Sequence, residues 1–185
     1  MATYKEFSDG DVTEVRGLCN ALMAFQAKHA TILPEVMGSM NFENRLLPEF
    51  QTIEDKTMVI AYVKDIPVGF GFATCTLLCE AELNQKPSWA DSLSGQGFYP
   101  KGYLSRKIGT FKLLYVNPDF RGMKIGENIC NKIMTWLNSK EADDLWVFVA
   151  NGNEGVGKLY EKLGFNYSHS VYNGFIQAYR LKPNL

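Results

Sequence analysis

Apolar side chains recur along this chain with two spacings, one typical of helices and one typical of strands. The helical spacing predicts helices at 11–28, 125–137 and 156–163, and a fourth from Pro34, a favoured first-turn residue, to Phe50. Runs rich in β-branched and aromatic residues, separated by turn residues, predict strands at 3–7, 58–63, 68–78, 109–116, 145–150, 165–171 and 175–181.

The order of these elements predicts how the strands pair. The strand–helix–strand units of the C-terminal half require at least one parallel pair with a right-handed crossover, whereas the hairpin at 58–78 is antiparallel. We therefore expect an α/β (α+β) fold with a mixed central sheet of about seven strands and about four helices. Gly69 and Gly71 weaken their strand and predict a bulge or a close approach of another part of the chain.

The segment 80–108 interrupts this alternation, because it is rich in the proline, glycine and serine residues of turns. A loop of this length inside a compact domain is usually functional or mobile. Its aromatic residues Trp89, Phe98 and Tyr99 favour a partly ordered segment over a linker. The chain shows neither repeats nor a second domain, so we interpret 1–185 as a single domain with 80–108 as a long loop or insertion.

Composition narrows the classes of partner. The 185 residues carry a net charge of -1, which argues against nucleic acid as the main partner because phosphate backbones select basic surfaces. The N-terminal residues lack the apolar core of a signal peptide. The most apolar stretch, 58–79, is interrupted by charges and a proline, and neither half of it reaches the roughly 20 residues of a membrane span. We expect a cytoplasmic protein without nucleic-acid or membrane partners.

The four cysteines do not predict a metal site. Cys75 and Cys79 lie in one strand-like run without a second pair, and the chain has only two histidines. We expect reduced, mostly buried cysteines and no metal.

The strongest chemical signal is the loop Arg121-Gly122-Met123-Lys124-Ile125-Gly126, which separates a strand from a helix. The first N–H groups of a helix have no partner within the helix, and with the helix dipole they attract anions. Two glycines let a ligand approach the backbone, and two basic side chains add positive charge. A pyrophosphate suits such a site, although an ordinary turn with a basic rim fits the loop alone equally well.

A second glycine-rich segment, 152–157, also follows a strand and begins a helix, but it does not fit the dinucleotide-binding pattern Gly-x-Gly-x-x-Gly. Gly155 and Gly157 each cost a helix roughly 1 kcal/mol relative to alanine. Close approach to a cofactor or simple tolerance near a helix start would explain them, and the sequence leaves both explanations open.

Together, the two segments resemble the GNAT N-acetyltransferase superfamily. Its Arg/Gln-x-x-Gly-x-Gly/Ala motif corresponds to 121–126, with Lys124 where the family usually has a glycine, so that this residue must adopt an allowed conformation or carry strain. Its Asn-x-x-Ala-x-x-Leu-Tyr-x-x-x-Gly-Phe helix corresponds to 153–165, with Val156 in place of the alanine. The resemblance implies a sheet splayed between the fourth and fifth strands.

The resemblance also implies acetyl-CoA as co-substrate and assigns residues to it. The implied cofactor-binding residues are Leu114, Tyr115, Val116, Arg121, Gly122, Met123, Lys124, Ile125, Gly126, Asn153 and Tyr160. The main chain at 114–116 would pair with the pantetheine arm, and a backbone N–H there would polarise the thioester carbonyl. Tyr160 matches the family's catalytic general acid for the leaving thiolate, and its alternative role is that of an amphipathic core tyrosine.

The acceptor is less defined by the residues. Some members of the superfamily have a glutamate base at the position of Lys112, so the general base of this protein is unassigned. Lys112 either attracts an acidic group of the substrate or is an ordinary exposed lysine. We expect the acceptor pocket between the first two helices and 80–108, where it could be lined by Gln26, His29, Glu35, Glu43, Arg45, Trp89 and Tyr99.

The expected activity is therefore acetyl transfer to a primary amine of a small molecule or an amino-acid-like acceptor. The alternatives are a non-catalytic CoA-binding module of the same fold and, with less support, a nucleotide-binding protein. The sequence leaves open whether the protein forms a homodimer.

Overall fold

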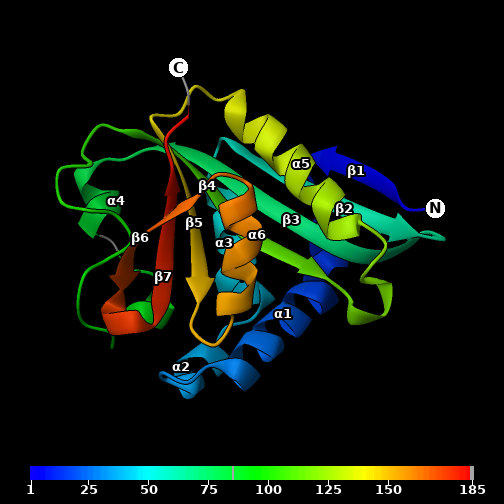
Figure 1. Ribbon diagram of the computed structural model, residues 1–185, viewed down its shortest axis with the longest axis horizontal. Coiled ribbons are helices and arrows are strands. Elements are labelled where there is room, and N and C mark those ends of the chain that lie inside the picture. The colour runs from blue at the N-terminus through cyan, green and yellow to red at the C-terminus, as the bar shows by residue number, and fades with distance from the viewer. Residues whose placement is uncertain (85, 184–185) are drawn as a thin grey trace.

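The computed structural model describes residues 1–84 and 86–183. Its strands form one seven-stranded sheet in the order β1-β2-β3-β4-β5-β7-β6 (Figure 1). Only β4 and β5 pair in parallel; the other neighbours are antiparallel, as the element order predicts. The strands are β1 (Thr3–Phe7), β2 (Lys56–Val63), β3 (Ile66–Leu77), β4 (Lys107–Val116), β5 (Asp144–Ala150), β6 (Asn166–Val171) and β7 (Ile176–Leu181).

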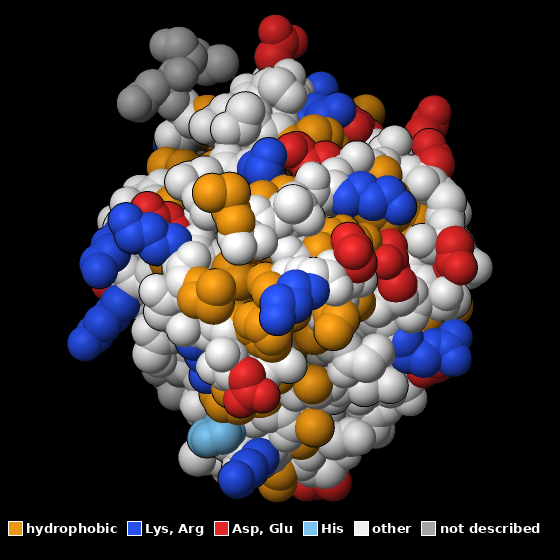
Figure 2. All heavy atoms as spheres, turned by 90° about the vertical axis from the view of Figure 1, so that its right-hand side faces the viewer, with side chains coloured by type: hydrophobic (Ala, Val, Ile, Leu, Met, Phe, Trp, Pro, Cys, Tyr) orange, Lys and Arg blue, Asp and Glu red, His pale blue; other side chains and the backbone are white. Residues whose placement is uncertain are grey.

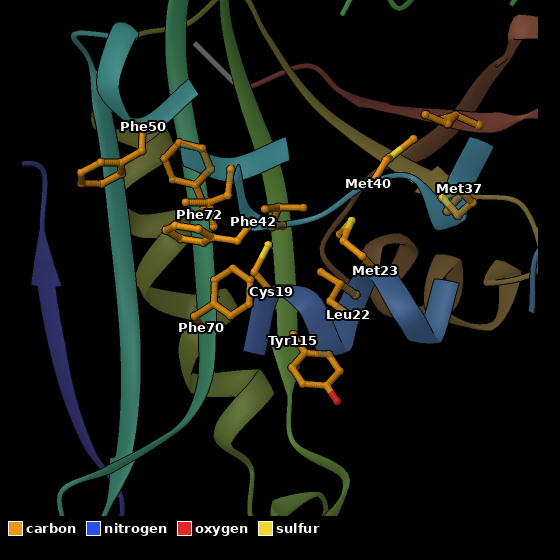
Figure 3. Close-up of a cluster of buried hydrophobic side chains, with 14 of the residues drawn as sticks. Cys19, Leu22, Met23, Met37, Met40, Phe42, Phe50, Phe70, Phe72 and Tyr115 are labelled. Carbon is orange, nitrogen blue, oxygen red and sulfur yellow. The ribbon is translucent and has the colours of Figure 1, made fainter. Parts of the chain in front are cut away.

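Helices cover both faces of the sheet. They are α1 (Arg16–His29), α2 (Pro34–Gly38), α3 (Leu47–Thr52), α4 (Glu80–Asn84), α5 (Ile125–Asn138) and α6 (Gly157–Lys162). On one face, side chains of α1 and of the segments that follow it pack against β3 and β4; Figure 3 shows Phe42 beside Phe70 and Phe72 of β3. On the other face, α5 and α6 cover the sheet (Figure 1). Among the described residues, none of the helices is long and apolar enough to cross a membrane.

The two glycines of β3 allow α5 to lie close to the sheet. A Cβ at Gly71 would stand 2.5 Å from Cγ2 of Ile129, and one at Gly69 would meet Ile129 Cδ1 at 3.3 Å. The β2–β3 register also shifts between Ala61 and Tyr62, next to the pairing of Gly69. The predicted close approach is therefore confirmed, and a bulge accompanies it.

The helix predicted from Pro34 to Phe50 is instead three short pieces. After α2, Asn41 is extended, with φ −151°, and its side chain accepts a hydrogen bond from the Asn44 N–H in a capping box. This cap starts a π-helical turn, η2 (Phe42–Leu46), and α3 follows with Pro48 in its first turn. Periodicity alone could not reveal these breaks, because apolar residues continue through all three pieces.

In the described part of the segment 80–108, aromatic side chains pack against the sheet. The segment contains α4 and the 3₁₀ turn η3 (Ser88–Ala90). The ring of Phe98 lies 4.9 Å from that of Phe148 on β5, and the ring of Tyr99 lies 5.8 Å from that of Trp146. Near the end of this segment, Arg106 forms an ion pair with the buried Asp144 at the start of β5, and Arg180 of β7 pairs with the same carboxylate.

Candidate functional site: two clefts at a strand splay

The parallel strands β4 and β5 separate part of the way along their length. They pair only over Ile108–Phe111 and Asp144–Val147. Beyond this point β4 pairs with β3 alone and β5 with β7 alone. The predicted splay between the fourth and fifth strands is therefore present, and it leaves one edge of each strand without a sheet partner.

A β-bulge marks the start of the splay. Phe72 of β3 lies opposite Leu113, whereas the next residue, Ala73, lies opposite Phe111, so that Lys112 is the extra residue of β4. Bulges bend a strand and redirect the side chain that they carry. The bulge therefore ends the pairing with β5 and gives Lys112 a direction of its own.

The register beyond the bulge determines which main-chain groups point into the gap. The Asn117 N–H donates to Val68 O at 2.9 Å, so Asn117 faces β3. Main-chain groups alternate sides along a strand, so Tyr115 also faces β3, while Leu114 and Val116 face the gap. Val116 O accepts a hydrogen bond from Arg121 Nε at 3.3 Å. Of the three predicted β4 residues, the backbones of Leu114 and Val116 are thus the ones available to a ligand.

The loop between β4 and α5 has two residues with positive φ, and one of them is Lys124. Gly122 has φ +79°, and Lys124, the residue before α5, has φ +58° and ψ +13°, in the left-handed region. Lys124 provides no side-chain cap for the helix. The first N–H groups of α5 are therefore left for an external acceptor.

These elements enclose a cleft of about 490 Å³, here called the loop cleft. Figure 2, which views the side of the molecule that carries the loop before α5, shows apolar side chains gathered among basic and acidic ones. Helix α1 provides the opposite wall through Leu22 and Phe25, and the Arg121 guanidinium lies 5.8 Å from the Phe25 ring centre. The charged side chains of the lining are Arg121, Lys124 and Glu127, two positive and one negative.

Most of the predicted cofactor residues meet in this cleft. Its lining includes Leu114, Tyr115, Val116, Arg121, Gly122, Lys124, Ile125, Gly126 and, from the segment after β5, Asn153. Met123 of the same loop is outside the lining, with half of its surface exposed. Leu22, Phe25 and Phe120 complete the walls; sequence reasoning missed them because nothing local to these residues marks them as part of a site.

Tyr160 of α6 is also outside the lining of the loop cleft. It is 5 % exposed, and its ring packs edge-on against Phe111 at 5.7 Å and Phe165 at 6.2 Å. Phe111 is the last β4 residue paired with β5, so Tyr160 lies beneath the point where the strands separate. Burial, and to a smaller extent the nearby Cys130 thiol, raises the pKa of Tyr160 and keeps its hydroxyl protonated.

Asn151, at the end of β5, holds the α1 side of the loop cleft in position and was not predicted from the sequence. It is 2 % exposed, and its Oδ1 accepts from the N–H groups of Thr31 at 2.7 Å and Ile32 at 2.8 Å. Its Nδ2 donates to Ile32 O and Phe175 O. A Cβ at the neighbouring Gly152 would stand 1.8 Å from His29 O. The chain after α1 is therefore attached to the end of β5.

The glycines of the second glycine-rich segment have different environments. A Cβ at Gly157 would lie 2.7 Å from the Tyr179 hydroxyl oxygen, whereas one at Gly155 would meet nothing within 4 Å. Gly157 therefore allows close packing of α6 on β7 instead of approach to a ligand, and Gly155 fits the explanation of simple tolerance.

A second and larger cleft, of about 1170 Å³, opens near the bulge and is here called the bulge cleft. Its walls come from η2, α3, β3, the segment 80–108 and the start of the splay. The lining includes Glu43, Arg45, Trp89 and Tyr99 of the residues predicted for the acceptor pocket, but not Gln26, His29 or Glu35. Lys112 and Phe148, on the two sides of the splay, are also part of it.

Three charged side chains of the bulge cleft form a linked group. Arg45 Nη1 lies 2.8 Å from Glu49 Oε1, and Lys112 Nζ lies 3.2 Å from Glu49 Oε2. Their side chains are 16 %, 27 % and 20 % exposed for Arg45, Glu49 and Lys112 respectively. Burial alone would raise the pKa of Glu49, but Lys112 and then Arg45 outweigh it and hold this pKa below its ordinary value. Glu49 is thus ionised at neutral pH, and the formal charge of the three side chains together is +1.

Comparison with known proteins agrees with this architecture. The model of the acetyltransferase (GNAT) family matches residues 30–165, which include β4, β5 and the loop before α5. No curated protein matched the sequence significantly. Because the family match spans well over half of the chain, this protein belongs to the acetyltransferase (GNAT) family.

Solved structures share the fold at low sequence identity. PaiA N-acetyltransferase from Thermoplasma acidophilum, solved in complex with coenzyme A, is similar with a TM-score of 0.64 and 14% identity over 98% of this chain and 99% of that one. An acetyltransferase of the GNAT family from Staphylococcus aureus Mu50 is similar with a TM-score of 0.59 and 12% identity over 98% and 99%. At such identities the similarity establishes the fold.

Proposed function

We propose that this protein is an acetyl-CoA-dependent N-acetyltransferase that acts on a primary amine of a small or amino-acid-like acceptor. The observation that carries the proposal is the position of the splay, because the edge of β4 leads from the loop cleft on one side to the bulge cleft on the other. A donor held in the first cleft and an acceptor held in the second would meet at the start of the splay.

The residues of the loop cleft fit a CoA pyrophosphate. The uncapped N–H groups at the start of α5 would bind its oxygens, and Arg121 and Lys124 would offset its charge. The outward-facing main chain of Leu114 and Val116 would bind the amide groups of the pantetheine arm in the manner of an added strand. The apolar wall of Leu22 and Phe25 would cover that arm.

Bound acetyl-CoA supplies the acetyl group as a thioester, so that a C–N bond forms as the C–S bond breaks, with one proton lost from the amine and one gained by sulfur. A main-chain N–H of β4 beyond the bulge would stabilise the negative charge on the carbonyl oxygen. Leu114 is suited to this role because its main chain faces the gap.

Tyr160 is our candidate for the group that stabilises the departing sulfur, supported by its position beneath the start of the splay. Its raised pKa keeps the hydroxyl protonated, as a donor must be. Complete transfer of this proton to a thiolate with a pKa of about 8.5 is uphill, so we expect Tyr160 to act mainly as a hydrogen-bond donor.

Thermal unfolding with and without CoA, followed by thiol release from acetyl-CoA with a panel of amines, tests the proposal. A ligand that binds only the folded state raises the melting temperature, so CoA should stabilise the protein. Tyr160→Phe should lower the rate of thiol release by about tenfold or more while leaving CoA stabilisation intact. Stabilisation by CoA without turnover on any amine would favour a non-catalytic CoA-binding module, and no stabilisation would refute both.

A further inference from the structure

We infer that the bulge cleft selects acceptors that carry a carboxylate close to the reacting amine, and that Lys112 and Arg45 bind this carboxylate. The inference rests on the proposed function and deepens it, since it specifies the chemical class of the acceptor. Its basis is the charged group of Lys112, Glu49 and Arg45 in a cleft that also contains a cluster of aromatic side chains.

The charge of this group favours an anion over a cation. Two cations share one carboxylate, so a bound carboxylate would bring the total from +1 to 0, whereas a bound ammonium would bring it to +2. All three side chains are less than one-third exposed, and Coulomb interactions in such partly buried places are weakly screened. A positively charged acceptor lacking an anionic group would therefore be repelled.

The remaining acidic side chains of the cleft do not reverse this preference. Glu43 lies 3.3 Å from the Arg16 guanidinium, and Asp55 lies 2.6 Å from Lys140 Nζ, so each has a cation of its own. Glu54 is exposed to solvent. The +1 group is therefore the main local charge near the start of the splay, where Lys112 lies.

Lys112 is also in the right place to act on the amine. It is the bulged residue directly before the unpaired edge of β4, so a carboxylate bound to it would hold a neighbouring amine close to that edge.

The rest of the acceptor should be apolar or aromatic. Trp89, Phe98, Tyr99 and Phe148 contribute rings to the lining, together with aliphatic side chains such as Leu78. A volume of about 1170 Å³ is larger than an amino acid needs, so the cleft also accommodates larger acceptors with the same pair of groups.

The test compares acceptors that differ only in the carboxylate. Thiol release from acetyl-CoA is measured with phenylalanine against 2-phenylethylamine, leucine against 3-methylbutylamine, and tyrosine against tyramine. We expect kcat/KM to favour the amino acid by at least tenfold in one or more pairs. In Lys112→Gln this preference should fall by at least tenfold, mainly through KM, since a charge-assisted contact is lost. Lys132→Gln, which removes a lysine paired with Glu6 outside both clefts, should keep the preference.

A measurement on the unaltered protein covers the case in which the Lys112 variant does not fold. 3-Phenylpropionate should inhibit competitively against the acceptor at least tenfold more strongly than 3-phenylpropanol. Equal or better use of the decarboxylated amines, an unchanged preference in Lys112→Gln, or no turnover with any of the pairs would overturn the inference. The proposed function fails separately, through the absence of CoA stabilisation and of thiol release with every amine tested.

Discussion

The two clefts on either side of the splay are lined by different parts of the chain. The lining of the loop cleft comes mainly from two nearly continuous segments, 114–116 and 120–127, and it includes two glycines and the uncapped start of α5. The bulge cleft consists of side chains from η2, α3, β3, β4 and the segment 80–108. A site made of backbone serves a constant chemical group, whereas a site made of side chains can change with each substrate. This difference explains why the loop cleft is recognisable in the sequence and the bulge cleft is not.

The largest effect is expected where the loop cleft depends on a distant side chain. Asn151→Ala should lower the free energy of unfolding by about 3 kcal/mol, because four buried or half-buried hydrogen bonds to Thr31, Ile32 and Phe175 lose their partner. It should also weaken CoA binding by loosening the α1 wall. Urea unfolding and CoA titration measure the two effects.

Asn138→Ala, at the exposed end of α5, is the control and should change stability by less than about 0.5 kcal/mol. If Asn151→Ala is equally harmless, the α1 wall does not depend on the end of β5. The structure of the loop cleft would then not depend on a side chain that is distant in the sequence.

The two clefts also differ in how much of each can be predicted from the sequence. The strands and the loop at 121–126 are predictable because periodicity, turn residues and helix-start chemistry are local properties. The Lys112–Glu49 contact is not, because it depends on the β4–β5 separation and on the break of the second helix at Asn41. Tyr160 shows a further limit, since its motif suggests a catalytic role while its packing alone suits a core residue.

A smaller effect should separate ligand binding from stability at Gly126. Its φ is not in the left-handed region, and a Cβ there would lie 3.6 Å from Val116 Cγ2, so Gly126→Ala fits without strain. Replacing a helical glycine should stabilise the fold by about 0.5–1 kcal/mol. The new methyl group would project beside Val116 in the loop cleft and should weaken CoA binding by about 10- to 100-fold, or about 1.4–2.7 kcal/mol.

Gly155→Ala is the matched control, because a Cβ there meets nothing within 4 Å and Gly155 is outside the lining of the loop cleft. It should leave CoA affinity unchanged. Unaltered CoA binding by Gly126→Ala would show that the start of α5 does not approach the ligand, and the backbone character of this site would be refuted.

In the bulge cleft, Glu49→Gln tests whether the three linked charged side chains stabilise the fold. The substitution leaves Lys112 and Arg45 without their shared anion and should cost about 1–2 kcal/mol at neutral pH. The pKa of Glu49 is lowered in the folded protein, so its stabilisation is present above its ordinary pKa of 4.5 and is lost as pH falls through the folded value. The difference between wild type and variant should therefore shrink below about pH 4.5.

Urea unfolding of both proteins at several pH values measures this difference. CoA affinity should change little, because Glu49 lies outside the loop cleft. A stability difference that is constant down to the lowest pH would mean that the charge of Glu49 is not what stabilises the cleft.

The smallest expected effect concerns Lys124, the one position where the loop departs from the family motif. Its φ of +58° is a conformation that costs a residue with a Cβ about 1 kcal/mol relative to glycine. Lys124→Gly should therefore be more stable than Lys124→Ala by about 1 kcal/mol, since both lose the charge but only glycine relieves the strain. If the lysine contributes charge, both variants should bind CoA more weakly by a similar factor. If only the alanine variant binds CoA more weakly, the loop conformation matters and the charge does not. Equal stability of the two variants would contradict the strain, and the loop would then tolerate lysine at no cost.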